Sequence, residues 1–118
     1  MFALHVLRVP VSDLARAKPF WTALLGVPPA EEAVDRSAAR YEAGGLKILL
    51  QALGPSGPRP LGGPLDFDLN HDDLQKLVAR LPKGRRAVIR ETPDGGKFLE
   101  TRDTDGNLVR VMWRPPAR

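Results

Sequence analysis

The chain has 118 residues, of which 42% are hydrophobic and none is cysteine, so one packed core is possible while disulfides and thiolate chemistry are excluded. No apolar run approaches the roughly 20 residues that a membrane span needs, and the N-terminus lacks a signal-peptide pattern, so we expect a cytoplasmic protein without a membrane partner. The net charge of +4 comes from scattered basic residues, the densest cluster being Lys83, Arg85 and Arg86, so nucleic acid is not expected as a partner either.

The first predicted elements are a strand and a helix. Apolar and polar residues alternate over 5–11, which indicates a strand. Apolar residues then recur at helical spacing over 14–25. Ser12 or Asp13 can cap the start of this helix, and Gly26 stands where a glycine commonly ends one.

A proline interrupts the pattern of the first predicted helix. Pro19 falls inside the predicted helix and removes a backbone donor, so we expect a distortion near Ala15 or a short first turn separate from the main helix.

Residues 30–43 predict two short strands, and residues 46–53 predict a longer one. Repeated proline and glycine over 55–64 then predict an exposed linker.

The second half repeats the order of the first. Asp13 and Leu14 correspond to Asp73 and Leu74 at an offset of sixty residues. The predicted elements are a strand from Leu65, a helix over 74–81, strands over 87–91, 98–102 and 108–114, and tight turns over 92–96 and 103–107. We therefore predict one α+β domain made of two βαβββ modules, over 1–54 and 65–114, joined by the linker 55–64.

Two motifs carry a resemblance to a known family. The stretch from Val9 to Gly26 reads V-P-V-S-D-L-A-R-A-K-P-F-W-T-A-L-L-G, and residues 103–108 read D-T-D-G-N-L. Together with the repeat, they resemble the vicinal oxygen chelate superfamily, which includes glyoxalase I, the bleomycin resistance proteins and the extradiol dioxygenases. Trp21 replaces the usual tyrosine of the first motif, and Thr104 replaces the usual proline of the second. The resemblance implies paired βαβββ modules whose curved mixed sheet surrounds a cleft, and commonly a homodimer.

The resemblance also implies where a catalytic metal would be bound. Carried over residue by residue, the ligand positions are Val6, Asp66 and Arg110. An arginine side chain has no acceptor and would repel a divalent ion. We therefore predict no cofactor, although a divalent metal ion held by His5 and Asp66 is the alternative if a bulge at Pro10 shifts the phase of the strand. His71 is interpreted as a capping or surface residue.

Strand alternation predicts which side chains face the cleft. They are Val6, Arg8 and Pro10 from the first strand, Asp66, Asp68 and Asn70 from the fifth, and Leu108, Arg110 and Met112 from the last. Val109, Val111 and Trp113 are then expected to face the helices. Among the cleft residues, Arg8, Asp66, Asp68, Arg110 and Met112 are the predicted ligand-binding set.

The charges in this set allow two readings. In one, the arginines pair with Asp66 and Asp68 and fill the cleft with an ionic network. In the other, an arginine binds a carboxylate or phosphate of an anionic small molecule.

Three functions remain open from the sequence. The chain could be a metal-independent small-molecule-binding protein, a metal-dependent lyase, isomerase or dioxygenase, or an interaction module with a vestigial cleft. The identities of residues 6 and 110 favour the first and third of these over the second.

Overall fold

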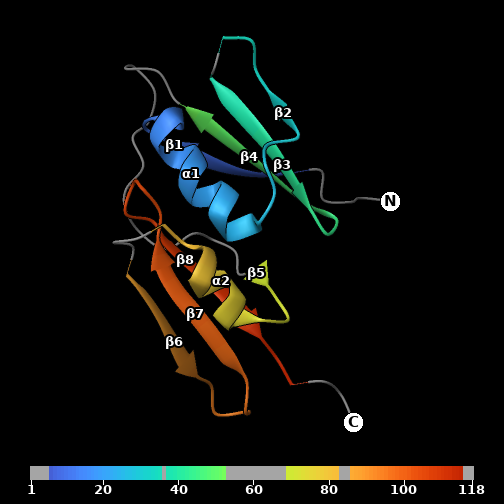
Figure 1. Cartoon of the computed structure of the whole chain (residues 1–118), viewed down its shortest axis with the longest axis vertical. Coiled ribbons are helices and arrows are strands. Elements are labelled where there is room, and N and C mark those ends of the chain that lie inside the picture. Colours follow the sequence, from blue (N-terminus) through green and yellow to red (C-terminus); the bar gives the residue numbers. More distant parts are fainter. Residues whose placement is uncertain (1–5, 36, 53–68, 83–85, 116–118) are drawn as a thin grey trace.

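The computed structural model describes residues 6–35, 37–52, 69–82 and 86–115. In chain order, its elements are β1 (Leu7–Val11), α1 (Leu14–Leu25), β2 (Glu31–Glu32), β3 (Ala38–Ala43), β4 (Leu46–Ala52), β5 (Leu69–Asn70), α2 (Leu74–Arg80), β6 (Ala87–Glu91), β7 (Lys97–Arg102) and β8 (Leu108–Trp113). This order is βαβββ twice, as the sequence predicts (Figure 1). The predicted linker 55–64 lies outside the described residues.

Each module builds its own mixed sheet. The strand orders are β1-β4-β3-β2 and β5-β8-β7-β6, and in both sheets the first and last strands of the module pair in parallel while the other pairs are antiparallel. A parallel pair needs a long crossover, which the helix and two further strands supply here. The two helices lie on the same side of the molecule in front of the sheets (Figure 1). The predicted α+β fold class is confirmed.

Both helices begin in the same way, at residues sixty positions apart. Asp13 and Asp73 have extended backbones, and their carboxylates accept hydrogen bonds from the backbone N–H of Arg16 at 3.3 Å and of Lys76 at 3.1 Å. Each aspartate therefore satisfies a donor that the first helical turn leaves unpaired. Of the two predicted caps for α1, Asp13 is the one used.

Pro19 does not divide α1. One helix continues from Leu14 to Leu25, so the expected short first turn separate from the main helix is wrong. A proline at position 19 deprives the carbonyl of Ala15 of its usual partner. Both residues are exposed on the helix surface, where water can hydrogen bond to that carbonyl instead.

The core lies between each helix and its sheet. The largest fully buried side chains are Trp21, Tyr41 and Phe20, and the rings of Phe20 and Trp21 meet edge to face with centroids 5.5 Å apart. The Tyr41 hydroxyl stays satisfied because it lies 2.8 Å from the Thr22 hydroxyl. Neither described helix combines the length and apolar character needed to cross a membrane.

The modules meet through side-chain contacts as well as through helix packing. Arg80 at the end of α2 donates from Nη2 to the carbonyl of Leu24 at 2.9 Å, near the C-terminus of α1. Asp105, in the turn before β8, accepts from the backbone N–H of Ser12 at 3.1 Å and also from its hydroxyl. Both ends of α1 are therefore tied to the second module.

Candidate functional site

Each sheet has one face against its helix and one face turned away from it, which we call the open face. Val109 and Val111 of β8 are buried in the core, and Trp113 packs against that core, as predicted. Because successive residues of a strand point to opposite faces, Arg110 and Met112 lie on the open face of the second sheet. The predicted assignment of strand faces is therefore confirmed for β8.

The same rule places the first strand. Val9 and Val11 are buried beneath α1, so Arg8 and Pro10 lie on the open face of the first sheet, where Arg8 is exposed. Arg8 is thus on a different sheet from Arg110 and Met112. The other predicted site residues, His5, Asp66 and Asp68, lie outside the described residues. The pairing of Asp66 and Asp68 with the arginines and the alternative metal site of His5 and Asp66 therefore stay predictions.

The described positions do not fit a divalent metal ion. Val6 offers only an alkyl side chain, and Arg110 offers a permanently charged guanidinium with no lone pair for a metal. Within the described ranges, no group of three or more histidine, aspartate or glutamate side chains is placed to hold an ion. His71 instead serves as a cap, because its Nδ1 accepts from the backbone N–H of Asp73 at 2.9 Å.

A hollow of about 460 Å³ lies on the open face of the second sheet, and we call it the arginine pocket. Its lining includes Arg86, Val88, Arg90, Glu100, Arg102 and Leu108. This volume falls in the range of small-molecule sites. Arg110 lies beside the pocket, because it is the Cα partner of Glu100 in the pairing of β7 with β8.

Sequence reasoning missed three arginines of this pocket, Arg86, Arg90 and Arg102. Arg86 belongs to the densest basic cluster of the chain, but Arg90 and Arg102 stand alone in the sequence, so no local run of basic residues joins the three. A usable signal was present in the alternation of β6 and β7. Arg90 shares the phase of Val88, and Arg102 shares the phase of Glu100, which puts both arginines on the open face.

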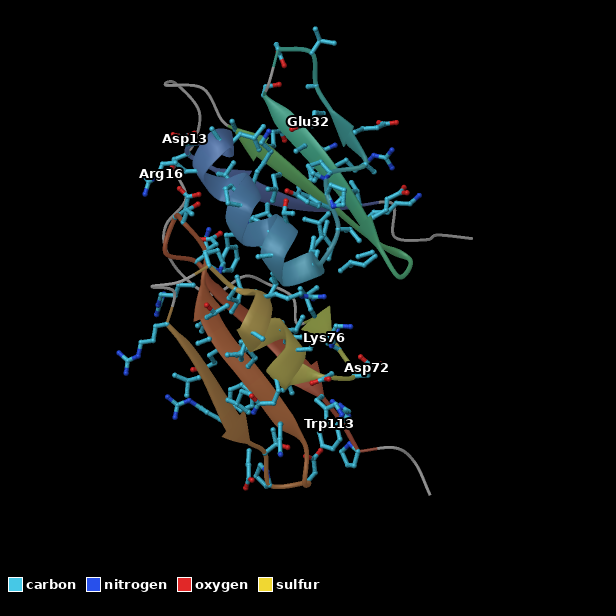
Figure 2. The ribbon with its side chains drawn as sticks, in the orientation of Figure 1. Asp13, Arg16, Glu32, Asp72, Lys76 and Trp113 are labelled. Carbon is cyan, nitrogen blue, oxygen red and sulfur yellow. The ribbon has the colours of Figure 1, made fainter. Side chains whose placement is uncertain are left out.

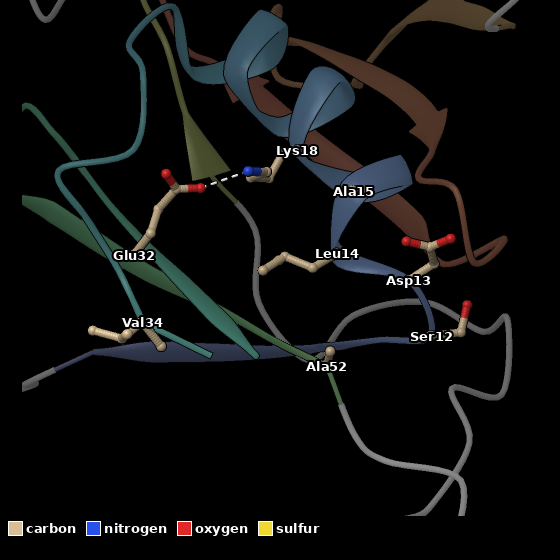
Figure 3. A pocket seen from close by; sticks show the side chains of 9 residues that line it. Ser12, Asp13, Leu14, Ala15, Lys18, Glu32, Val34 and Ala52 are labelled. Atoms are coloured by element: carbon tan, nitrogen blue, oxygen red, sulfur yellow. Dashed lines mark hydrogen bonds and ion pairs between the residues drawn. The ribbon is translucent and has the colours of Figure 1, made fainter. Parts of the chain in front are cut away.

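Two other hollows lie on the helix side of the sheets. One, of about 680 Å³, is lined by the start of α1, by Glu32 to Val34 and by Ala52, and Lys18 pairs with Glu32 at 2.5 Å within it (Figure 3). A smaller one of about 170 Å³ lies at the start of α2 and reaches Trp113. Asp13 and Leu14 line the first, and their counterparts sixty residues later line the second. A hollow that recurs at equivalent places is a property of the module, so the arginine pocket is the better candidate site.

The fold and the site together define a class of protein. Two βαβββ modules, each with a mixed sheet that is covered by a helix on one face and carries polar side chains on the other, define an α+β protein of paired modules. The sequence profile of the glyoxalase/bleomycin resistance protein/dioxygenase superfamily matches residues 3–111. The chain belongs to this superfamily, and the predicted family is confirmed.

Several solved structures share the fold. TnmS3, an antibiotic binding protein from Streptomyces sp. CB03234, is 26% identical with a TM-score of 0.74, over 98% of this chain and 99% of its own. A lactoylglutathione lyase from Agrobacterium tumefaciens is 18% identical with a TM-score of 0.72, over 94% of this chain and 92% of its own. A glyoxalase/bleomycin resistance protein from Catenulispora acidiphila DSM 44928 is 18% identical with a TM-score of 0.71, over 94% and 97%. No curated protein matches the chain.

Proposed function

We propose that this chain binds a small molecule on the open face of its sheets and uses no catalytic metal. The observation that carries the proposal is Arg110. It occupies a position at which the family resemblance implies a metal ligand, and a guanidinium there repels a divalent ion. A site of this kind favours sequestering or sensing a ligand over metal-assisted turnover.

The likeness to TnmS3 supports the same proposal. That protein is described as antibiotic binding and shares 26% identity with this chain over nearly the full length of both. Family membership by itself leaves the function open, because one fold hosts many chemistries. The arginine at position 110 and the volume of the arginine pocket add the argument for binding without metal.

Metal analysis tests this proposal. The protein is purified without chelator and dialysed, and its metal content is measured by elemental mass spectrometry. We expect no divalent ion in a stoichiometric amount. The melting temperature should also be the same with EDTA as with added zinc or manganese. An ion raises the melting temperature only if the folded protein binds it, and no group of ligands among the described residues is placed to bind either ion. One tightly bound ion per chain, or a melting temperature that rises with micromolar metal, would contradict the proposal.

The open faces also favour a homodimer. Within the described chain, the modules meet through α1, α2 and the contacts of Arg80 and Asp105, and the strands form two separate sheets. If the binding cleft requires a sheet opposite each open face, a second copy of the chain can supply that sheet. Closed two-fold dimers are the commonest oligomers of soluble proteins.

Light scattering after size-exclusion chromatography tests the oligomeric state. We expect a mass near twice the 12.9 kDa of one chain at micromolar concentration. High salt should leave this mass unchanged if burial of apolar surface holds the dimer, because salt screens charge pairs and not apolar contacts. A mass of one chain at every concentration tested would rule out the dimer.

A further inference from the structure

Among the described residues, each sheet has two edge strands, and three of these four edges are poorly suited to pairing with another strand. β2 and β5 have two residues each, and both residues of β2 are glutamates (Glu32 in Figure 2). β1 contains Pro10, which has no backbone N–H to donate. Short strands, charged side chains and proline are means by which proteins protect sheet edges. The remaining edge is β6, which has five residues and no proline.

The backbone hydrogen bonds of β6 show which of its groups face outward. Thr92 donates its backbone N–H to the carbonyl of Gly96 at 2.9 Å, and these two residues continue the register of β6 with β7. Hydrogen-bonded and non-hydrogen-bonded pairs alternate in an antiparallel pair, so Val88 and Arg90 bond to β7 as Thr92 does. The other N–H and C=O groups of β6 point away from β7, and they belong to Ala87, Ile89 and Glu91.

No strand of the described chain pairs with β6 on that outer side, where β6 lies at the border of the second sheet (Figure 1). Val88 is half-buried on the open face, and Ile89 is half-buried on the helix side. Ile89 also lines the hollow of about 170 Å³ at the start of α2, together with Trp113. Outward backbone groups beside incompletely covered apolar side chains are suited to binding another strand.

A second copy of β6 is complementary to this edge. Around a two-fold axis, two antiparallel β6 strands can be centred on Val88, Ile89 or Arg90 if their outward groups are to meet. Centring on Arg90 sets two Arg90 side chains opposite each other, and centring on Val88 sets Arg90 opposite Arg86. Both registers are disfavoured because like charges lie directly opposite. Centring on Ile89 sets Arg90 opposite Val88 and also pairs all five residues of the strand.

The register centred on Ile89 also satisfies the backbone of the edge. Ile89 lies opposite Ile89 of the second copy, and Ala87 lies opposite Glu91, so each outward N–H meets an outward carbonyl. The two Ile89 side chains cover each other on the helix side, with their Cβ atoms about 5 Å apart. Arg90 keeps its ion pair with Glu100 at 3.3 Å, because that pair lies on the open face between β6 and β7.

We infer that β6 pairs with β6 of a second copy, antiparallel and centred on Ile89. The pairing joins two four-stranded sheets into one of eight strands. This inference rests on the proposed homodimer and specifies the strands through which the two copies meet. A two-fold axis perpendicular to the sheet keeps the open faces of both copies on one side, so the open face of each copy is bordered by that of the other.

Light scattering of variants tests the surface. Ile89→Lys sets two cations opposite each other at the centre of the pair and is expected to weaken dimerisation about tenfold or more. Val34→Lys is the matched control, because Val34 is a fully exposed apolar residue of the other module. Glu91→Pro removes an outward N–H and no bond to β7, so it should also weaken the dimer, whereas Glu91→Ala should not. Circular dichroism verifies that each variant is folded.

Disulfide formation tests the register. The chain contains no cysteine, so each introduced thiol is unique. In the inferred register, Val88 lies opposite Arg90 of the second copy with Cα atoms about 4.5 Å apart, which is within the range of a disulfide. A mixture of Val88→Cys and Arg90→Cys should therefore form the mixed disulfide about fivefold faster than either variant alone forms its own. Intact mass spectrometry distinguishes the mixed species from the two others.

The outcomes separate this inference from the proposed function. A dimer that persists in Ile89→Lys and Glu91→Pro meets through another surface and overturns the strand pairing, as does an equal loss in Val34→Lys. Faster cross-linking of one cysteine variant alone overturns the register. A monomeric unchanged protein overturns both the homodimer and the pairing, and leaves β6 to a strand of another protein. None of these results bears on metal content, which tests the proposed metal-free binding by itself.

Discussion

Replacing Asp103 with alanine is expected to lower the free energy of unfolding by about 3 kcal/mol or more. The Asp103 side chain is only 1% exposed. Its Oδ1 accepts from the backbone N–H groups of Asp105 at 3.0 Å and Asn107 at 2.8 Å, and its Oδ2 accepts from the Asn107 amide at 3.1 Å. Alanine would leave these three donors without their acceptor. Urea denaturation followed by circular dichroism measures the loss.

The variant Asp103→Asn is the matched control. Asparagine keeps one oxygen for the two backbone donors but turns an amide nitrogen toward the amide of Asn107, so an intermediate loss is expected. An alanine variant as stable as the unchanged protein would show that this turn contributes little to stability.

The pH dependence of the difference in stability between the unchanged protein and Asp103→Asn gives an independent test. Burial raises the pKa of the Asp103 carboxyl above its ordinary value of 3.8, and hydrogen bonds from Asn107 and from the backbone of Asp105 offset part of this rise. Protonation is then easier in the folded state than in the unfolded state. The stability of the unchanged protein relative to Asp103→Asn should therefore rise as pH falls through the folded pKa, and the gain should be complete below 3.8. A difference that is constant with pH would contradict the raised pKa.

The turn built on Asp103 also joins the modules. Asp105, two residues further on, accepts from the backbone N–H of Ser12 at the start of α1. In Asp103→Ala, the amide hydrogen of Ser12 should exchange faster with solvent than in the unchanged protein, because its acceptor is no longer held in place. The stability loss and the looser contact between modules have the same origin.

Replacing Gly26 with alanine is the second large effect, with an expected loss of about 2–3 kcal/mol. Gly26 ends α1 with φ of +75°, a left-handed conformation that costs energy for any residue with a Cβ. A Cβ added there would lie only 2.8 Å from Cζ of Arg80, in the guanidinium that donates to Leu24. The variant must therefore adopt a strained backbone and also displace the contact between α1 and α2. Thermal and urea denaturation measure the combined loss.

Two controls separate the strain from the lost contact. Gly45→Ala carries a similar backbone cost at φ of +85° with no atom within 4 Å of the added Cβ, so it should lose only the conformational part. Arg80→Met removes the guanidinium and keeps an apolar stem, so Gly26→Ala should cost less in that background than in the unchanged protein. Equal losses for Gly26→Ala in the two backgrounds would show that Arg80 is not involved.

The parts of the fold that could be predicted are those set by the sequence within a few residues. The cap at Ser12 or Asp13, the glycine stop at Gly26 and the alternation along β8 depend on neighbours within a few residues. The structure has the cap at Asp13 and the other two as expected. Pro19 is the exception. The energetic cost of a proline in a helix depends on whether water reaches the carbonyl that it leaves unpaired, and the exposure of that side of α1 is a tertiary property.

The sequence by itself determined the two modules, the faces of β1 and β8 and the presence of a cation at residue 110, because periodicity and residue identity are local properties. Only the tertiary structure decided that Arg86, Arg90 and Arg102 surround Glu100. Their grouping depends on which residues of β6, β7 and β8 stand opposite one another, and pairing between strands sets that register over distances that no local pattern reports.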